Sequence, residues 1–391
     1  MKGNRLFKKI DYLIGIPIIF ILGFFTKFLG LFSRNRDQSL SSGDQILVVK
    51  LSALGDTFLL LPIFKALKEK IGPTGKILMI ATPINQPALE NLPYIDEVLL
   101  LDFGQISKNI KNLLDFINRL RKFKPTLALD FDQWLRISPL LCFMSGAPLR
   151  YGFKTSRQHR HFLYQKKVLN KNNQHEFDQF VSIAELAGIE KSKINNFNGF
   201  IEKEKLYKTH SRQRSSTEFL IHIHPGCGES GWQRAWPENY YVELIKKLKN
   251  KTNIKIQMTG MGSYEINLVR KIIQDTGQEV KDFSGKLEIN QLSELLKKSD
   301  LVICGNTGIM HLAAGLGCSL IALHGPTNPA KWGPLPSIQP DGKPISVLSA
   351  KIACSPCLTL GFEYGCDARP CMQSISVKDV FEEAIRLLEK N

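Results

Sequence analysis

The stretch ILVVKLSALGD, residues 46–56, decides the fold of this chain. Its first six residues are apolar except for one lysine, which is typical of a parallel strand buried on both faces. A Ser-Ala-Leu-Gly turn follows, and Asp56 then opens a helical pattern that runs to Lys70. A buried strand, a glycine-containing turn and an amphipathic helix form the repeating unit of a doubly wound parallel α/β sheet.

Units of the same kind continue along the chain and predict two successive α/β domains. In the first half, the pattern predicts strands at 77–81, 98–101 and 127–131, and helices near 87–92, 106–123 and 135–144. In the second half, it predicts strands at 219–224, 254–258, 301–304 and 320–324, and helices near 239–249, 264–274, 291–298, 308–316 and 377–389. A length of 391 residues is comfortable for two such domains.

Changes of composition set the expected domain boundaries. Residues 1–43 form a basic, hydrophobic segment with a polar tether, and residues 44–187 form the first Rossmann-like domain. A polar and basic linker, 188–218, leads to the second Rossmann-like domain, 219–376, and to a C-terminal helix, 377–391. In this architecture we expect the ligand in a cleft between the domains, at the carboxyl ends of the strands.

The N-terminal segment is strongly apolar. Basic residues crowd its first nine positions, and apolar runs follow at 13–25 and, after Lys27, at 28–32. No small-residue cleavage site follows, which argues against a secretory signal. The first run is shorter than the ~20 residues of a spanning helix, and Pro17 is expected to interrupt a simple helix. We therefore expect an in-plane or re-entrant membrane anchor on the cytoplasmic side. A span over 12–32 with a snorkelling lysine, or a helix packed on the protein itself, are the alternatives.

The formal net charge of +16 predicts an anionic partner, which nucleic acid, an anionic membrane or a phosphorylated substrate would satisfy. The eight cysteines divide into two groups. Four are isolated in apolar or glycine-rich contexts, which suits a reducing compartment and a cytosolic body. The others form a C-x2-C-x8-C-x4-C cluster, a candidate zinc site with reduced packing thiols as the alternative: Cys354, Cys357, Cys366 and Cys371.

Asp56 is the first residue with a chemical interpretation. A carboxylate at the carboxyl end of a strand is well placed to act as a general base. The alternative is a purely structural helix N-cap.

Two later motifs suit an anionic ligand. Arg234 lies after a glycine-rich loop and just before a proline-started helix, where a guanidinium can clamp a phosphate; the alternative is that Trp236 and Pro237 merely cap and pack that helix. Thr307 and Gly308 start another helix, whose exposed N–H groups suit a diphosphate. His311 lies one turn on and shares a face with Thr307, either as a ligand contact or as a structural histidine.

Three motifs together resemble glycosyltransferase family 9, the lipopolysaccharide heptosyltransferases. They are KLSALGD (50–56), HPG with RAWPE (224–238), and NTGIMHLAAGLG with LHGPTNP (306–329), and the resemblance runs from Ile46 to about Val380. It implies a GT-B fold with two Rossmann-like domains facing across a cleft, and inverting transfer that requires no cofactor. It also implies an ADP-heptose donor and a lipid A–core acceptor. The apolar segment 13–25 and the basic surface predict a peripheral or monotopic place at the cytoplasmic face of the inner membrane.

The resemblance also assigns roles. Asp56 corresponds to the catalytic base. The residues that correspond to the family's donor-binding residues are Arg234, Glu265, Asn306, Thr307, Gly308 and His311. Within this set, Arg234 faces the diphosphate and Glu265 the ribose. Asn306 stands where the family commonly has aspartate, which leaves the identity of the donor sugar open.

Basic residues of the first half are candidates for the acceptor or the membrane. Arg150, Lys154 and Arg157 lie in a stretch with interleaved aromatics and are our candidates for binding acceptor phosphates, while anionic lipid headgroups or a simple solvated face are alternatives. Nucleic acid is not expected, because no nucleic-acid-binding module surrounds the stretch.

Two other functions remain open on the sequence. One is another two-Rossmann nucleotide-sugar enzyme, such as an epimerase, and the other is a non-catalytic membrane-bound scaffold of the same fold. A dehydrogenase is not indicated, because no G-x-G-x-x-G follows either leading strand.

Overall fold

The computed structural model describes residues 5–28, 39–106, 109–207, 218–251, 253–335, 343–358 and 365–389. The chain forms two compact units, Met1–Asn195 (unit 1) and Asn196–Asn391 (unit 2). Their boundary lies inside the expected linker region, 188–218, and each unit is described by itself.

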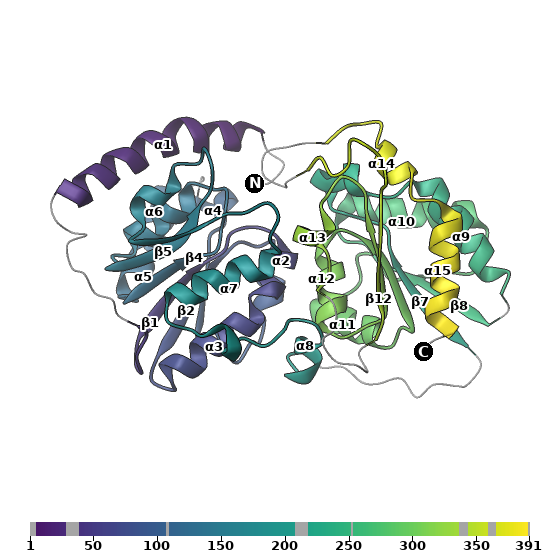
Figure 1. Ribbon diagram of the computed structural model, residues 1–391, viewed down its shortest axis with the longest axis horizontal. Coiled ribbons are helices and arrows are strands. Elements are labelled where there is room, and N and C mark those ends of the chain that lie inside the picture. Colours follow the sequence, from purple (N-terminus) through teal and green to yellow (C-terminus); the bar gives the residue numbers. More distant parts are fainter. Residues whose placement is uncertain are drawn as a thin grey trace. The chain divides into compact units, whose positions relative to one another are not determined.

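Unit 1 is built on a six-stranded, wholly parallel sheet with the order β3-β2-β1-β4-β5-β6 (Figure 1). Its strands are β1 (Gln45–Val49), β2 (Lys76–Ala81), β3 (Glu97–Leu100), β4 (Leu127–Asp130), β5 (Leu149–Lys154) and β6 (Lys166–Leu169). This is the Rossmann order, whose connections reverse direction between β1 and β4. The reversal leaves a topological switch point at the carboxyl ends of these two strands.

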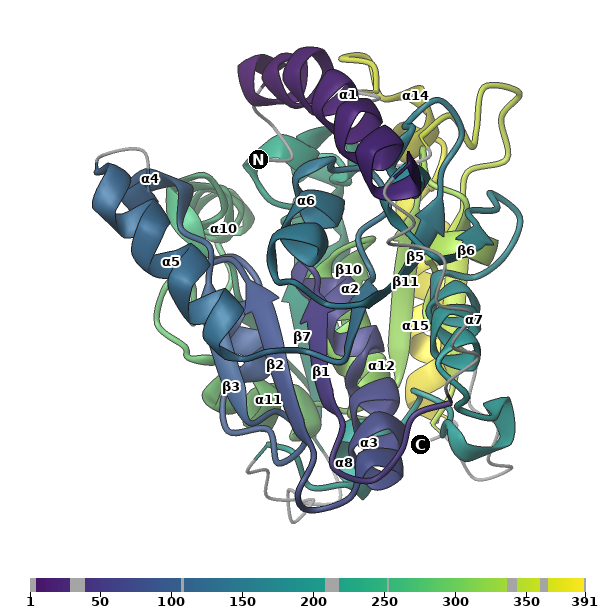
Figure 2. The ribbon, with the colours of Figure 1, turned by 90° about the vertical axis from the view of Figure 1, so that its left-hand side faces the viewer.

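Helices surround this sheet, with α1 lying over α6 (Figure 2). They are α1 (Arg5–Phe28), α2 (Leu54–Leu59), α3 (Leu61–Ile71), α4 (Phe103–Ile106), α5 (Ile110–Lys122), α6 (Ile137–Met144) and α7 (Glu176–Leu186), with 3-10 turns η1 (Gln86–Leu89), η2 (Arg160–Leu163) and η3 (Lys191–Lys193). Leu47 and Val49 of β1 share a buried core with Phe116 and Leu120 of α5 and Leu141 of α6. The continuous apolar run of β1 thus forms part of the core, as expected for a central parallel strand.

Unit 2 repeats the same topology with the order β12-β11-β10-β7-β8-β9, again wholly parallel. Its strands are β7 (Phe219–His224), β8 (Ile254–Met258), β9 (Lys281–Asp282), β10 (Leu301–Gly305), β11 (Leu320–His324) and β12 (Ile345–Ser349). Its helices are α8 (Phe200–Lys203), α9 (Glu238–Lys249), α10 (Gly262–Thr276), α11 (Ile289–Lys297), α12 (Gly308–Gly315), α13 (Pro329–Trp332), α14 (Pro370–Gln373) and α15 (Val377–Glu389), with the 3-10 turn η4 (Glu229–Arg234). The switch point of unit 2 lies between β7 and β10.

The two Rossmann-like sheets confirm the predicted fold class, an α/β protein of the GT-B type with an apolar N-terminal helix. All eight predicted strands are present. The sequence missed β5 and β6, because their lysines and arginine gave the segment the appearance of a basic surface, and it missed the helix α7 and the short or edge strands β9 and β12.

One expectation about the N-terminus is wrong. Pro17 does not interrupt the segment: α1 is one continuous helix with this proline inside it. Of the second apolar run, 28–32, the structure describes only Phe28, and of the tether after it only residues 39–43.

Candidate active site

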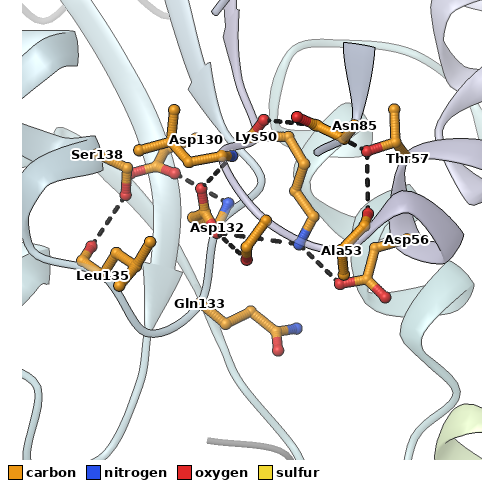
Figure 3. A network of polar contacts seen from close by, with 12 residues as sticks. Lys50, Ala53, Asp56, Thr57, Asn85, Asp130, Asp132, Gln133, Leu135 and Ser138 are labelled. Atoms are coloured by element: carbon orange, nitrogen blue, oxygen red, sulfur yellow. Dashed lines mark hydrogen bonds and ion pairs between the residues drawn. The ribbon is translucent and has the colours of Figure 1, made fainter. Parts of the chain in front are cut away.

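The switch point of unit 1 is lined with charged side chains that are buried. Lys50 follows β1 directly, and its Nζ lies 2.9 Å from Oδ2 of Asp56 and 4.0 Å from Oδ1 of Asp132 (Figure 3). The whole residues are 2% (Lys50), 6% (Asp56) and 2% (Asp132) exposed. Asp132 comes from the segment after β4, so β1 and β4 contribute opposite charges to one network.

Lys50 remains protonated in this network. Burial by itself would lower the pKa of its ammonium group, but the carboxylates of Asp56, Asp132 and Glu176 outweigh burial, so the pKa of Lys50 is raised. The ring of Phe180, 5.3 Å from Nζ, adds a cation–π contact. A fixed positive charge therefore stands beside the Asp56 carboxylate.

Hydrogen bonds hold this network to the strand ends. The backbone N–H of Leu51 donates to Asp132 at 2.6 Å, and the hydroxyl of Ser52 donates to the same carboxylate at 3.2 Å. Asn85, from the segment after β2, donates to the Lys50 carbonyl at 2.9 Å and to the Thr57 hydroxyl at 3.0 Å (Figure 3). The groups around Asp56 are therefore positioned by three neighbouring strands.

The alternative interpretation of Asp56 as an N-cap is wrong. The N-cap of α2 is Ala53, and Asp56 lies in the first turn of the helix, where its carboxylate pairs with Lys50. Ala53 has φ +69°, a conformation that costs an L-residue about 1–3 kcal/mol. Such strain is characteristic of turns whose geometry serves a site.

The switch point of unit 2 holds Arg234, which is half-buried at the end of η4. Its Nη1 donates to the Asn306 carbonyl at 2.6 Å and to Asn306 Oδ1 at 3.0 Å, and its Nη2 donates to the Cys227 carbonyl at 3.1 Å. Among the residues that the structure describes, these bonds leave the Nε–H and one Nη2–H of the five guanidinium donors for a ligand. A Cβ on Gly231 would lie 2.4 Å from Nη2, so a larger residue there would displace the guanidinium from this position.

Asn306 and the turn after it complete this group. The Asn306 amide donates to the Trp332 carbonyl at 2.9 Å, which fixes the orientation of its Oδ1 towards Arg234. Thr307 is the N-cap of α12 and, like Gly308, is half-buried, while His311 inside the helix is 5% exposed. Arg234, Asn306 and the start of α12 therefore lie together, as the motifs predicted.

The structure also supports the alternative role of Trp236 and Pro237, which was to pack and cap the helix that follows Arg234. Trp236 is buried and its Nε1–H donates to the Ile375 carbonyl at 2.9 Å, while Pro237 occupies the N-cap of α9. These residues pack and start the helix, and Arg234 before them is left to contact Asn306.

Glu265 joins two loops at the same sheet edge. Its carboxylate accepts hydrogen bonds from the N–H of Gly228 at 2.7 Å and from the N–H of Met261 at 2.8 Å, and lies 3.7 Å from Nε2 of His224. A Cβ on Gly226 would lie 2.2 Å from the Glu265 carboxylate, so this glycine makes room for it. Glu265 is 5% exposed, and the contact with a ribose stays a prediction.

The three candidate acceptor residues are not alike. Arg150 is 7% exposed and donates to the backbone carbonyls of Leu163 and Ala147, at 2.9 and 2.5 Å. Burial lowers the pKa of its guanidinium. Lys154 and Arg157 are exposed. Contact of Arg150 with an acceptor stays a prediction that this burial does not favour.

The cysteine cluster gathers around Cys371. Burial raises the pKa of this thiol, a hydrogen bond with the Met372 backbone lowers it, and the sulfurs of Cys357, Cys366 and Cys354 raise it further. The last three are exposed. In the part of the chain that the structure describes, no set of three or more His, Cys, Asp or Glu side chains is arranged to hold a metal ion. Zinc binding stays a prediction, which zinc analysis of the purified protein and its Cys354→Ser variant will test.

Lys50, Asp132 and Asn85 are the site residues that the sequence did not single out. Each lies one to four residues beyond the end of a parallel strand, and that position is the signal that was available. A lysine inside an otherwise apolar strand pattern is the most specific of these signals, because an unpaired lysine is rarely buried.

Known proteins share this architecture. The model of glycosyltransferase family 9 (heptosyltransferase) matches residues 113–364. Lipopolysaccharide heptosyltransferase 2 of Escherichia coli strain K12 is 24% identical over 301 residues, which cover 74% of this chain and 85% of that protein. Among solved structures, the family 9 glycosyltransferase of Veillonella parvula DSM 2008 has a TM-score of 0.69 at 19% identity, over 90% of this chain and 100% of that one. E. coli heptosyltransferase WaaC with ADP-2-deoxy-2-fluoro heptose has a TM-score of 0.64 at 18% identity, over 88% and 99%.

The fold and these matches define the class: the protein is a glycosyltransferase. The chain belongs to glycosyltransferase family 9, the heptosyltransferase family.

Proposed function

We propose that this enzyme transfers a heptose from an ADP-heptose donor to a lipid A-linked core acceptor of lipopolysaccharide, with inversion at the anomeric carbon. The observation that carries the proposal is the buried Lys50–Asp56 pair at the switch point of unit 1, in a chain whose family is that of the heptosyltransferases. The donor is supported by the relative WaaC, which is known with an ADP-heptose analogue, and the acceptor by relatives named for lipopolysaccharide.

In the proposed reaction, unit 1 activates the acceptor. The Asp56 carboxylate takes the proton of an acceptor hydroxyl as the hydroxyl oxygen forms its bond to the anomeric carbon. The protonated Lys50 pairs with that carboxylate and holds it in place beforehand. The attack comes from the face opposite the nucleotide, so the configuration of the anomeric carbon inverts.

Unit 2 stabilises the leaving group. As the bond between the anomeric carbon and the diphosphate oxygen breaks, ADP leaves with the electron pair and its negative charge grows. Arg234 retains two N–H donors, and the first turn of α12 after Thr307 offers backbone N–H groups. Preorganised donors of this kind stabilise developing charge without a metal ion or another cofactor.

We also propose that the protein works at the cytoplasmic face of the inner membrane, as a peripheral or monotopic protein. A lipid A-linked acceptor resides in a membrane. In α1, the window Lys9–Thr26 has a mean hydropathy of 1.7 and is long and apolar enough to cross one, by length and composition.

Product analysis tests the transfer. The purified protein is incubated with ADP-heptose or a UDP-sugar, with and without a lipid A–Kdo acceptor, and the products are identified by mass spectrometry. We expect an acceptor heavier by one heptose, formed only from the ADP donor. Conversion of the donor without an acceptor would identify an epimerase instead. A protein that binds neither nucleotide sugar in calorimetry would be a scaffold.

A further inference from the structure

Helix α1 carries an apolar face that the described part of unit 1 leaves exposed. Of the sixteen large apolar side chains that are exposed in the described residues, ten belong to this helix: Ile10, Tyr12, Leu13, Ile14, Ile18, Phe20, Ile21, Phe24, Phe25 and Phe28. Leu13 is 68% and Phe24 66% exposed. Contiguous exposed apolar surface of this kind marks an interaction site in a folded protein.

The opposite face of α1 is docked on unit 1 along a buried stripe that contains two glycines. Gly15, Ile19, Gly23 and Thr26 are buried, and their spacing of four, four and three places them on one stripe. A Cβ on Gly15 would lie 2.8 Å from Cβ of Arg136, and one on Gly23 would lie 3.1 Å from Cβ of Phe162. The helix backbone therefore approaches α6 and η2 closely (Figure 2).

Asp11 fastens the helix to the beginning of α6. Its Oδ1 accepts hydrogen bonds from the N–H groups of Arg136 and Ile137 at 2.9 and 3.2 Å, and its Oδ2 lies 3.0 Å from Nη1 of Arg136. The carboxylate thus caps a helix that is 125 residues away in sequence. The Arg136 side chain is fully buried, so separation of α1 would leave its charge without this partner.

These contacts are not compatible with a helix that crosses a bilayer. They extend from Asp11 to Gly23, about 18 Å of helix at ~1.5 Å per residue, and so occupy most of the window Lys9–Thr26 that is apolar enough to span. A helix held along that length on a folded domain cannot pass through ~30 Å of hydrocarbon at the same time. The exposed face is left to enter a membrane sideways.

The charge of the two units favours an anionic lipid surface as the partner of the exposed apolar face of α1. Residues 1–195 contain 28 basic and 16 acidic residues, a net charge of +12, whereas residues 196–391 contain 24 and 20, a net charge of +4. Exposed Lys154 ends β5, and exposed Arg157 lies in the turn just before His159. The ring of His159 is 5.5 Å from that of Phe20 on α1. Basic residues beside an inserted apolar face strengthen binding to anionic headgroups.

We infer that α1 is a monotopic lipid-binding helix: it lies in the plane of an anionic leaflet, inserts its exposed face, and is held on the acceptor unit by Asp11 and the glycine stripe. The inference rests on the proposed membrane location and deepens it. The membrane contact thereby becomes part of the unit that we propose to activate the acceptor.

Vesicle binding tests the surface. The full chain and a Leu13→Glu/Phe24→Glu double variant are sedimented with vesicles of phosphatidylcholine, with and without phosphatidylglycerol. We expect the parent to bind more tightly when phosphatidylglycerol is present, and the double variant to bind at least about ten-fold more weakly with an unchanged melting temperature. The matched control is Leu114→Glu, at a 53% exposed leucine of α5, which should bind like the parent. Parent-like binding by the double variant, or an equal loss in the control, would overturn the inference.

Depth measurements separate an in-plane helix from a spanning one. Tryptophan is placed at Leu13, Ile18 or Phe25, and its quenching by phospholipids brominated at shallow or deep acyl positions is compared with that of the parent. An in-plane helix predicts the same shallow depth at all three positions. Quenching of Ile18→Trp at the bilayer centre would show a span and sink the proposal.

Two acceptor forms keep this test apart from the test of the proposed function. With a deacylated, water-soluble acceptor the double variant should turn over like the parent, and with an acceptor embedded in vesicles it should lose most of its rate. If the parent uses neither acceptor, the proposed function fails, while the binding and depth results still decide the role of α1.

Discussion

The two units share one topology and carry opposite chemistry at the same point of it. Both sheets have the Rossmann order, and in both the side chains of interest lie where the first and fourth strands end. In unit 1 this point holds the carboxylates of Asp56 and Asp132 around Lys50. In unit 2 it holds Arg234, Asn306 and the start of α12. Topology therefore places a candidate site, whereas the few residues after each strand decide which charges it holds, and on those charges we base the proposed roles of proton acceptor and anion binder.

The sharpest test of this division is Asp56→Asn. The amide keeps the shape of the side chain but cannot accept the proton, so we expect kcat to fall about 10³-fold with the donor Kd within about two-fold of the parent. Single-turnover kinetics and calorimetry measure the two quantities. Near-normal turnover would remove Asp56 from the role of base.

Arg234→Gln should show the converse pattern. Loss of the guanidinium removes a positive charge from the donor diphosphate, so we expect kcat/KM for the donor to fall about 10²-fold together with weaker donor binding. Arg119→Gln is the control, because Arg119 is an exposed arginine paired with Glu97 in unit 1. If Arg234→Gln left donor binding intact, the assignment of the donor to unit 2 would be lost.

Lys50→Met tests whether unit 1 depends on its buried cation. Without the ammonium group the ionised form of Asp56 is disfavoured, so the acid limb of kcat against pH should move up by about one pH unit, with a loss of roughly ten-fold at neutral pH. Lys50→Arg should restore the profile in part. A purely structural role predicts less folded enzyme but an unmoved limb, so melting curves are recorded alongside.

Asn306→Asp examines the departure from the common family residue. A carboxylate 3.0 Å from the Arg234 guanidinium would pair with it and reduce the positive charge available to the diphosphate. We expect donor affinity to fall about five-fold in calorimetry. Unchanged or tighter donor binding would show that Arg234 does not act through its charge.

Acid should affect unit 2 through its buried histidines. Burial, and then the ring of His224, lower the pKa of His222 to about 3. Burial likewise lowers the pKa of His324 to about 3. An unfolded histidine takes up its proton near pH 6.5, so stability is lost as the pH falls from about 6.5 towards 3, by about 1.4 kcal/mol per pH unit for each histidine.

His222→Gln measures that contribution. The amide can keep the hydrogen bond to Thr259 but does not titrate. The slope of the unfolding free energy against pH, between pH 6.5 and 3, should therefore become smaller by about 1.4 kcal/mol per pH unit. A Trp134→Phe background restricts the tryptophan signal to unit 2, which holds the other three tryptophans. An unchanged slope would mean that His222 is not buried in its neutral form.

Local patterns were sufficient for much of the fold. Apolar runs such as 219–224 and 301–304 are confirmed as strands, since a parallel strand buried on both faces leaves a continuous signature. The same signature is absent from β5 and β6, where buried Arg150 and two lysines interrupt it. Nor did the pattern distinguish a proline that ends a helix from Pro17, which lies inside one.

By itself the sequence determined the order of the elements, the positions of Asp56, Arg234 and Thr307 at strand ends, and membership of a glycosyltransferase family. These properties depend on neighbours within a few residues. Only the tertiary structure decided which charges meet: Lys50 with Asp132, Arg234 with Asn306, and Asp11 with Arg136. All three pairs lie 72 to 125 residues apart in the sequence. A buried charge is stable only where packing brings its counter-charge or hydrogen-bond acceptor within contact distance.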